Sequence, residues 1–374
     1  MTQRRPPLRG PSFLYVLFLE SPFRGARHLT AESAATRRLI DLLNEGSGPT
    51  AAQGAVLAVC AGDRAWSVGL ARDGEAAPPE SARFLTYSIT KTMTAVAVLR
   101  LVGQGVLDLD APLDRWLPDF APAGRITLAQ VLMHRASLYN YGGMPRYHAA
   151  VRAGLEPWTD DEFLAFCRAD QLFAPPGQDF SYSNIGYLLV KRVLERAADI
   201  PFAEVLRRDL FAPLGLTDWS VPTRRDDLAG LHFGPSAYLG GEGAAVEVSG
   251  LYHPGWVSHG VVAATALDTA RLLHGLFTGG LLPDALLARM TAAEPVPGSM
   301  RGRPWVEPGY GLGLMVELDP QAGPCWGHTG GGPGCTPAAY HFPGTKPLTV
   351  AVFTDGEDGG QAEWMVWEAA DALR

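Results

Sequence analysis

The chain has 374 residues, of which 47% are hydrophobic and 19% charged, and its formal net charge is −8. This length is enough for two or three domains, and the composition is too apolar for a disordered protein. The negative charge argues against a protein that grips phosphate backbones, so we expect no nucleic-acid partner.

The N-terminal segment holds one short apolar run, Phe13–Leu19, which follows several arginines and ends at Glu20. The run is far below the roughly 20 residues that span a bilayer, so we expect no membrane span. It is similar to a short signal core, but no clear small-residue cleavage site follows. We therefore predict an N-terminal extension over residues 1–29 and a cytoplasmic protein. An exported form follows if residues 1–29 are an atypical signal.

The next segment predicts a helix and a hairpin. A helix is expected at Ala31–Asn44, with Thr30 as its cap and a leucine-rich apolar stripe. Two apolar runs, Ala55–Cys60 and Ala65–Leu70, are separated by a short turn and predict a β-hairpin.

The segment Ser88–Leu101 is apolar on nearly every side. A helix without a polar face belongs inside the protein, and Gly103 and Gly105 are expected to end this one. Residues 106–230 carry helix-period stretches broken by proline and glycine. Residues 231–260 predict a long loop rich in glycine and aromatic residues, and long loops of this kind are usually functional.

The C-terminal third returns to strands. A helix is expected at Ala266–Thr278, and a last helix at Gln361–Arg374 closes the chain. Between them, strands are expected at Gly311–Leu318, Cys325–Thr329, Thr336–Phe342 and Leu348–Thr354. Strands thus occur towards both chain ends, with a helical block inserted between them.

Four cysteines in a chain of this length do not make a disulfide framework. Cys60 and Cys167 lie in apolar runs and are expected in the core. Cys325 and Cys335 flank a glycine-rich turn, so either a bond between them or two free thiols is open. No C-x-x-C or H-x-H pattern occurs, and Gly309–Gly313 lacks the setting of a dinucleotide loop. We expect no metal and no cofactor.

The first chemical motif is Ser88-Ile89-Thr90-Lys91 at the start of the buried helix. Residues three apart share a helix face, so the Lys91 amine can reach the Ser88 hydroxyl. A serine needs a base beside it to become a nucleophile, and a desolvated lysine can serve. The alternative is a helix-capping serine, but only three lysines occur in the chain, and a lysine on an apolar helix needs an explanation.

The second motif is Tyr182-Ser183-Asn184, which precedes another predicted helix. In an extended segment, residues two apart point the same way, so the Tyr182 phenol and the Asn184 amide can face one site. The phenol could relay a proton, and the amide could hold a substrate carbonyl and Lys91. The alternative is that Tyr182 is a core residue and Asn184 a helix cap.

The third motif is His328-Thr329-Gly330, on a predicted strand that continues into Gly331. H-x-G alone is common by chance in this chain, and only the strand and the glycine run give it weight. Glycine lets a substrate or an oxyanion come close to backbone N–H groups.

The ordered set S-x-x-K, Y-x-N and H-T-G resembles the serine β-lactamase and D,D-peptidase family, the penicillin-recognising serine hydrolases, in its class C-like branch with esterase-like members. The resemblance also covers connecting segments such as Val106–Leu113, Ile126–His134 and Pro213–Asp218, and it extends over about residues 30–374.

This resemblance implies an α/β (α+β) fold of the β-lactamase/transpeptidase type. An antiparallel sheet flanked by helices would come from residues 30–110 and 255–374. An all-helical subdomain with the active-site loop would come from residues 111–254. The active site would lie in the cleft between them.

The resemblance also implies site roles. Ser88 would be acylated, with Lys91 and Tyr182 as the proton-transfer pair. Asn184 would hold the substrate, and the N–H groups of Ser88 and Gly331 would form the oxyanion hole. The strand residues His328, Thr329 and Gly330 would line the substrate. His328 stands where true β-lactamases carry lysine, so we expect a charge that titrates near pH 7 in place of a permanent one.

We therefore predict a serine hydrolase that acts through an acyl-enzyme on an ester or amide of a small molecule or short peptide, as an esterase, D-amino-acid peptidase or β-lactamase-like enzyme. The alternative is a penicillin-binding sensor that is acylated without efficient turnover. Trp256, Trp305 and Trp326 are expected either as apolar walls of the substrate cleft or as core residues. The oligomeric state is left open.

Overall fold

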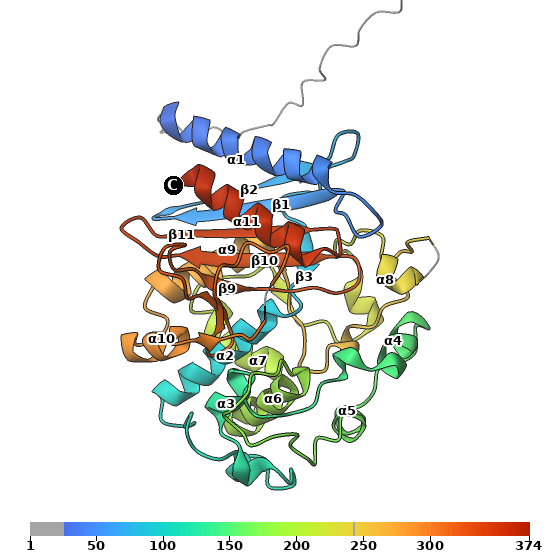
Figure 1. The fold of residues 1–374 in the computed structure, drawn as a ribbon, viewed down its shortest axis with the longest axis vertical. Coiled ribbons are helices and arrows are strands. Elements are labelled where there is room, and N and C mark those ends of the chain that lie inside the picture. The colour runs from blue at the N-terminus through green and yellow to red at the C-terminus, as the bar shows by residue number, and fades with distance from the viewer. Residues whose placement is uncertain (1–25, 242–243, 299) are drawn as a thin grey trace, which may run out of the picture.

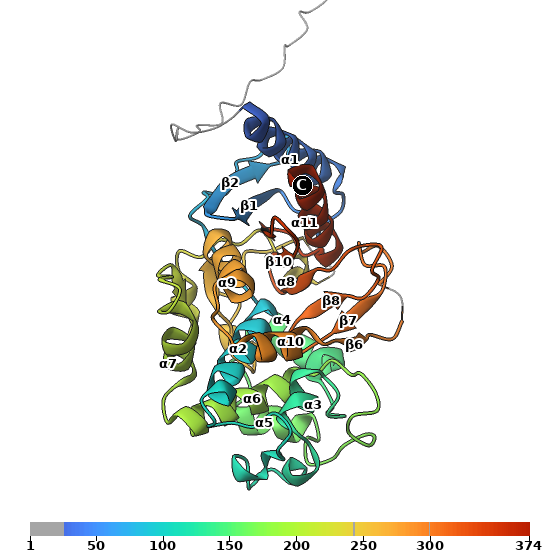
Figure 2. The same cartoon turned by 90° about the vertical axis from the view of Figure 1, so that its left-hand side faces the viewer.

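The computed structural model describes residues 26–241, 244–298 and 300–374. The predicted apolar run Phe13–Leu19 lies outside these residues. Figure 1 shows a sheet with helices on its faces in the upper half of the molecule and a group of helices in the lower half. Figure 2, turned by 90°, shows the same two parts stacked along the long axis, with both described chain ends in the upper part.

The main sheet has eight strands in the order β2-β1-β11-β10-β9-β8-β7-β6, and its neighbouring strands pair antiparallel. The first hairpin therefore lies beside the last strand, with Ala55 opposite Thr354. The strands are β1 (Gly54–Ala61), β2 (Arg64–Ala71), β6 (Glu294–Pro295), β7 (Pro308–Tyr310), β8 (Met315–Glu317), β9 (Trp326–Thr329), β10 (Thr336–Phe342) and β11 (Leu348–Thr354). A second, three-stranded sheet joins β3 (Arg83–Leu85), β5 (Ala263–Thr265) and β4 (Trp219–Ser220).

Helices α1 (Ala26–Glu45), α9 (Ala266–Thr278) and α11 (Gly359–Leu373) cover the main sheet, and α2 (Ile89–Gly103) also contacts β9 and β10. Helix α1 contacts α11, which covers β10 and β11, whereas α9 packs on β1, β10 and β11. The remaining helices are α3 (Leu128–Leu132), α4 (Pro145–Arg152), α5 (Asp160–Phe166), α6 (Asn184–Ala198), α7 (Phe202–Leu206), α8 (Ala237–Gly240) and α10 (Asp284–Thr291).

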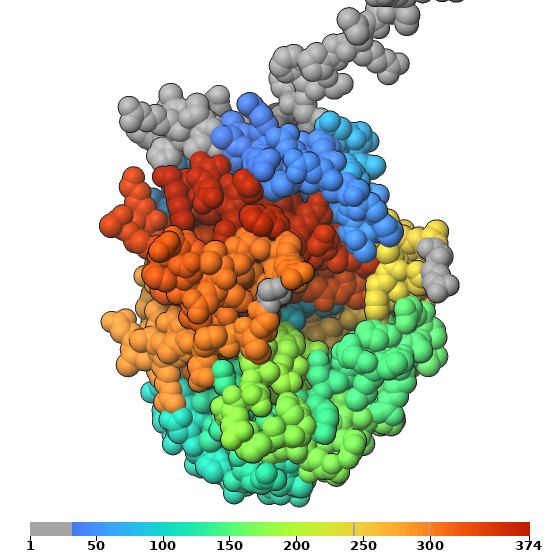
Figure 3. Space-filling model, in the orientation of Figure 1, coloured from blue at the N-terminus to red at the C-terminus, as the bar shows by residue number. Residues whose placement is uncertain are grey.

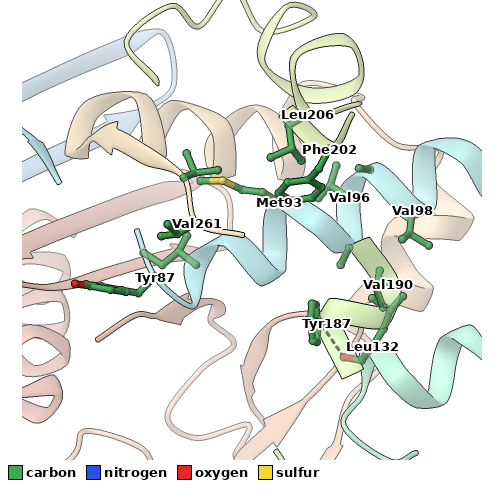
Figure 4. Packing of buried hydrophobic residues seen from close by; sticks show 14 of the residues in the cluster. Tyr87, Met93, Val96, Val98, Leu132, Tyr187, Val190, Phe202, Leu206 and Val261 are labelled. Atoms are coloured by element: carbon green, nitrogen blue, oxygen red, sulfur yellow. Dashed lines mark hydrogen bonds between the residues drawn. The ribbon is translucent and has the colours of Figure 1, made fainter. Parts of the chain in front are cut away.

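Helix α2 lies in the centre of the core, as its all-round apolar sequence predicts. Residues 89–99 of α2 are all buried. In Figure 4, Met93 lies near Phe202 and Leu206 of α7, while Val98 lies towards Val190 of α6. The helix therefore carries its N-terminus to the boundary between the sheet and the helical part, and residue 88 stands at that boundary.

Much of the predicted secondary structure is confirmed. The bounds of α9, β10 and β11 are those predicted, the first hairpin extends one residue beyond each predicted end, and α11 begins two residues earlier than expected. The antiparallel sheet flanked by helices, with a helical part beside it, confirms the predicted fold class. The division of the chain at residues 110 and 255 stays a prediction.

Two expectations are wrong. Helix α1 begins at Ala26, so Thr30 lies inside the helix and is not its cap. The single strand expected at Gly311–Leu318 is instead the end of a β7–β8 hairpin, because the chain turns at Gly313, whose φ is +78°. A Cβ at Gly313 would lie 2.4 Å from the Cβ of Ala95, so this turn can pack on α2 only without a side chain.

Within the described residues, no helix is both long enough and apolar enough to cross a membrane. The same part of the chain contains no group of three or more histidine, cysteine or acidic side chains arranged to hold a metal. All four cysteines are buried and free, so Cys325 and Cys335 do not form a disulfide.

Candidate active site

Ser88 lies where two cavities meet. A cavity of about 480 Å³ and a second of about 330 Å³ are both lined by Ser88, Arg303 and Thr329. In Figure 3 the surface is hollowed between the red and orange C-terminal part and the green helical part. The predicted nucleophile is therefore accessible from the cleft between the sheet and the helices.

The backbone before Ser88 is strained. Tyr87 has a φ of +43°, a conformation that costs a bulky residue about 1–3 kcal/mol. The Tyr87 hydroxyl donates a hydrogen bond to the carbonyl oxygen of Pro333 at 2.9 Å, which holds the strained residue in place. Ser88 stands at the N-cap of α2, but its side chain caps no helix N–H group, so the alternative of a capping serine is wrong.

Lys91 places its amine beside the Ser88 hydroxyl. The Lys91 Nζ lies 3.2 Å from Ser88 Oγ, 2.8 Å from Asn184 Oδ1 and 2.8 Å from Nε2 of His259. The side chain is fully buried, and among the described residues no carboxylate pairs with it. Burial without a counter-charge lowers the pKa of Lys91 well below its ordinary value. A neutral amine is the form that can take a proton from Ser88.

Tyr182 and Asn184 reach the same point from the segment before α6. The Tyr182 hydroxyl donates to Ser88 Oγ at 2.9 Å, while Asn184 contacts Lys91. The intervening Ser183 points the other way and caps α6 by accepting from the N–H of Gly186. Burial raises the pKa of Tyr182, so the phenol keeps its proton and acts as a donor. The predicted arrangement of the second motif is thus present, and Asn184 is not the helix cap.

The backbone N–H groups of Ser88 and Gly331 make no hydrogen bond within the described residues, and both residues line the larger cavity. Gly330 brings the two segments together, because a Cβ there would lie 2.3 Å from the carbonyl oxygen of Thr86. At Gly331, by contrast, a Cβ would meet nothing within 4 Å. Two free N–H donors beside a nucleophile are what an oxyanion hole needs.

His328 does not carry the titrating charge that the sequence led us to expect. Its Nδ1–H donates to the carbonyl oxygen of Thr329 at 2.7 Å, so its Nε2 accepts from the Tyr310 hydroxyl at 3.0 Å. Burial, together with the nearby Lys91, lowers the pKa of His328 to about 3. The ring is therefore neutral at physiological pH. The expectation failed because burial outweighs the ordinary pKa of a histidine.

Thr329 and Arg303 border both cavities. The Thr329 hydroxyl donates to Oε1 of the buried Glu363 at 2.7 Å, and Arg303 Nη1 donates to the same oxygen at 3.0 Å. Neither Arg303 nor Glu363 belongs to the three motifs. Both lie far from Ser88 in the chain: the packing of α11 against β9 brings Glu363 to the site, and Arg303, from the segment between β6 and β7, pairs with it there.

His259 is the functional-site residue that sequence reasoning missed. It lies in the predicted loop over residues 231–260, and none of the three motifs includes it. The structure places its Nε2 against Lys91, and burial and Lys91 lower the pKa of His259 well below its ordinary value. A lone histidine before a glycine gives no signal that could have found it.

An aromatic wall forms one side of the larger cavity. It includes Tyr141, Tyr147 and Trp256, with ring centroids of Tyr141 and Tyr147 4.7 Å apart and those of Tyr147 and Trp256 5.5 Å apart. Trp305 and Trp326 do not line either cavity and instead pack against other aromatic side chains. Of the three tryptophans considered as substrate walls, only Trp256 lines a cavity, and because it is 1% exposed it is at the same time a core residue.

The comparison with protein families decides the identity of this fold. Residues 39–372 match the family model described as Beta-lactamase. The chain belongs to the Beta-lactamase family. This confirms the resemblance seen in the three motifs, and the ordered set Ser88, Tyr182 and His328 is the part of the sequence that carried it.

Within the Beta-lactamase family, the chain is similar to proteins of several activities. It is 31% identical to Esterase EstB of Burkholderia gladioli, covering 70% of this chain and 74% of that protein. It is 28% identical to Penicillin-binding protein 4 of Amycolatopsis lactamdurans, covering 73% of this chain and 72% of that protein. The structure of a D-stereospecific amidohydrolase from Streptomyces sp. superposes with a TM-score of 0.75 at 25% identity, covering 91% of this chain and 98% of that one. The family is thus shared by relatives named for ester, penicillin and amide chemistry.

Proposed function

We propose that the protein is a serine hydrolase that cleaves an ester or amide of a small molecule or short peptide through an acyl-enzyme on Ser88. The observation that carries the proposal is the position of Ser88 Oγ, which lies 3.2 Å from the buried Lys91 amine and 2.9 Å from the Tyr182 hydroxyl. A nucleophile, a neutral base and a proton donor meet at one atom.

Each side chain has a defined part in the acylation. Ser88 Oγ bonds to the substrate carbonyl carbon and gives its proton to Lys91 Nζ. The negative oxygen of the tetrahedral intermediate lies at the N–H groups of Ser88 and Gly331. The bond to the leaving group then breaks, the leaving group takes the Tyr182 phenol proton, and the Lys91 ammonium returns the proton taken from Ser88 to the phenolate, so that Lys91 and Tyr182 are both neutral in the acyl-enzyme. In deacylation the same steps run in reverse: water gives a proton to the Tyr182 oxygen as the phenol proton passes to Lys91, water bonds to the acyl carbon, and the departing Ser88 Oγ takes a proton back from Lys91.

The cavity favours an acyl group with an apolar or aromatic body. Tyr147 is partly exposed and gives the larger cavity a surface on which a ring can stack, and the buried Tyr141 and Trp256 support it from behind. Arg303 and Thr329 stand at the junction of the two cavities, where a polar substituent of the substrate can reach them. The relatives named as an esterase and as a D-stereospecific amidohydrolase support an ester or an amide as the bond that is cleaved.

A β-lactam is a weaker candidate for rapid turnover. His328 is neutral and buried, so the third motif supplies no cation for a β-lactam carboxylate. The similarity to Penicillin-binding protein 4 keeps acylation by penicillin in view. The second candidate function is therefore a sensor that is acylated by a β-lactam and deacylated slowly.

A panel of activated substrates tests the proposal. The panel holds p-nitrophenyl acetate, p-nitrophenyl phenylacetate, the p-nitroanilides of D- and L-phenylalanine, and a chromogenic cephalosporin. We expect turnover of at least one ester or anilide, a mass increase on Ser88 equal to the acyl group, and loss of both in Ser88→Ala. The matched control is Ser67→Ala on β2, which removes a hydroxyl from the sheet and should leave the rates unchanged.

Two results would change the reading. Hydrolysis at the wild-type rate in Ser88→Ala would overturn the mechanism, because the reaction would then proceed without the Ser88 hydroxyl. Stable labelling of Ser88 by penicillin, with no measurable turnover of any ester or anilide, would select the sensor over the hydrolase.

A further inference from the structure

His259 shares the Lys91 amine with the two groups already described. Lys91 Nζ lies 2.8 Å from His259 Nε2, 2.8 Å from Asn184 Oδ1 and 3.2 Å from Ser88 Oγ. The ring is 1% exposed, and its other nitrogen, Nδ1, is buried without a hydrogen-bond partner among the described residues. Lys91 is thus the only described group that contacts a nitrogen of this imidazole by a hydrogen bond.

The hydrogen-bonding capacity of an amine limits what these neighbours can do. A neutral lysine has two N–H groups and one lone pair, and Lys91 must direct the lone pair at Ser88 Oγ to act as a base. Asn184 Oδ1 accepts one N–H group, so His259 Nε2 is left to accept the other. If Nε2 instead carried a proton, it would donate to the lone pair and block the base.

We propose that His259 is a positioning residue that acts through Lys91, and that its Nδ1-protonated tautomer accepts a Lys91 N–H at Nε2 and thereby aims the lone pair at Ser88. This inference rests on the proposed function, because it assigns Lys91 as the base. The same His259 tautomer can accept a hydrogen bond from Lys91 in both the neutral and the charged form of the amine. The ammonium that forms when Ser88 loses its proton has three N–H donors and no acceptor, and it still needs an unprotonated Nε2.

A neutral acceptor suits this position better than a carboxylate would. The titratable groups that act on His259 are Lys91, Lys191, His134 and His328; none is acidic, and each would oppose a positive charge on the imidazole when protonated. All of these favour the neutral imidazole. An aspartate or glutamate beside Lys91 would hold the amine in its charged form, whereas a neutral imidazole accepts a hydrogen bond and leaves the amine free to lose its proton.

The loop around His259 is held from both sides. Ser258 donates from its backbone N–H and its hydroxyl to the Tyr141 hydroxyl, at 3.3 and 3.1 Å. Gly260 has a φ of +82°, and a Cβ there would lie 2.9 Å from the Phe202 ring. The ring of His259 also meets Tyr187 edge-on, with centroids 6.2 Å apart. A residue fixed in this way can orient its neighbour.

Two substitutions separate positioning from packing. His259→Gln can still place an acceptor oxygen near Nζ, whereas His259→Leu fills the space without one. We expect His259→Leu to lose about 10- to 100-fold in the acylation rate with KM changed by less than about twofold, and His259→Gln to retain most of the rate. We also expect the acid limb of kcat/KM against pH to move to lower pH in His259→Leu, because the Lys91 ammonium loses an acceptor. A purely structural role would not move that limb.

The tautomer can be measured without any substrate. Side-chain ¹⁵N–¹H spectra of the wild-type protein labelled with ¹⁵N-histidine distinguish Nδ1–H from Nε2–H, and the signals missing in His259→Gln assign the residue. We expect the Nδ1–H form. This measurement stands if His259→Leu fails to fold.

The outcomes separate this inference from the proposed function. An Nε2–H tautomer, or a folded His259→Leu variant with wild-type rate and acid limb, would overturn the role of His259 while Ser88-dependent acylation persisted. Absence of acylation in the wild type, with the Nδ1–H tautomer present, would instead remove the proposed function and leave only the contact.

Discussion

Two buried ionisable side chains, Glu363 and Lys91, contact the residues around β9, and they differ in whether a side chain of opposite charge pairs with them. Glu363 of α11 is 0% exposed and accepts hydrogen bonds from Arg303, Thr329, Tyr340 and the indole of Trp305. Lys91 of α2 is also 0% exposed, but its partners Ser88, Asn184 and His259 are neutral groups.

The difference shows how one protein keeps a buried charge in one place and avoids one in another. Burial raises the pKa of Glu363, and Arg303 with the three donors opposes that rise, so the carboxylate is compensated. Nothing opposes the lowering of the pKa of Lys91. The carboxylate is a structural group, and the amine is free to exchange protons.

The largest expected effect comes from removing the amine. Lys91→Met keeps an unbranched side chain one atom shorter than lysine but leaves Ser88 without a base, so we expect acylation to fall by about 10³-fold or more. The free energy of unfolding should not fall, because an uncompensated buried amine is replaced by an apolar group. Burst kinetics and urea denaturation measure the two quantities. The double variant Ser88→Ala/Lys91→Met should be no slower than Ser88→Ala alone, and additive losses would contradict a shared role.

Removing the Glu363 carboxylate, in contrast, should lower the free energy of unfolding. Glu363→Leu leaves Arg303 and three other donors without their acceptor, so we expect a loss of about 3 kcal/mol in the free energy of unfolding. The control is Glu368→Leu, on the same helix, whose carboxylate pairs with Arg38 at the surface and should contribute less than about 1 kcal/mol. Equal losses in the two variants, measured by chemical denaturation, would show that burial of the pair does not matter.

A smaller change gives Lys91 a partner of opposite charge, which is what Glu363 has in Arg303. Asn184→Asp places a carboxylate at the position of an oxygen 2.8 Å from Lys91 Nζ. The new charge favours the ammonium and raises the pKa of Lys91, so the neutral base is lost as pH falls through a higher range than in the wild type. We expect the rate at pH 7 to drop by about tenfold and to recover as pH rises. An acid limb of kcat/KM that stays in place would contradict a neutral Lys91.

The sequence was a good guide to what depends on local pattern. Helix α9 and strands β10 and β11 have strong periodicity and clear ends, and their predicted bounds agree with the structure. The motifs also placed Ser88, Lys91, Tyr182 and Asn184 in one site, because helical and extended spacing fix which side chains share a face.

What depends on long-range packing could not be predicted. The short strands β3, β4 and β5 form only because their partners hold them, and a segment of two or three residues has little strand preference of its own. His259 and Glu363 reach the site through contacts between elements distant in the chain. The pKa of His328 depends on its burial, which a motif does not encode.

The pairing of β1 with β11 has a consequence for how the chain is made. β1 is the second strand from one edge of the sheet, between β2 and β11, and nearly all of its residues are buried, but the strand on its inner side, β11, is the last strand of the protein. During synthesis the apolar hairpin leaves the ribosome with one edge unpaired, and it must wait until almost the whole polypeptide has been translated before that edge is closed. Truncation shortly before Leu348 should therefore yield an aggregating product and not a smaller folded one, and chaperone dependence should be greatest for nascent chains that lack only this final strand.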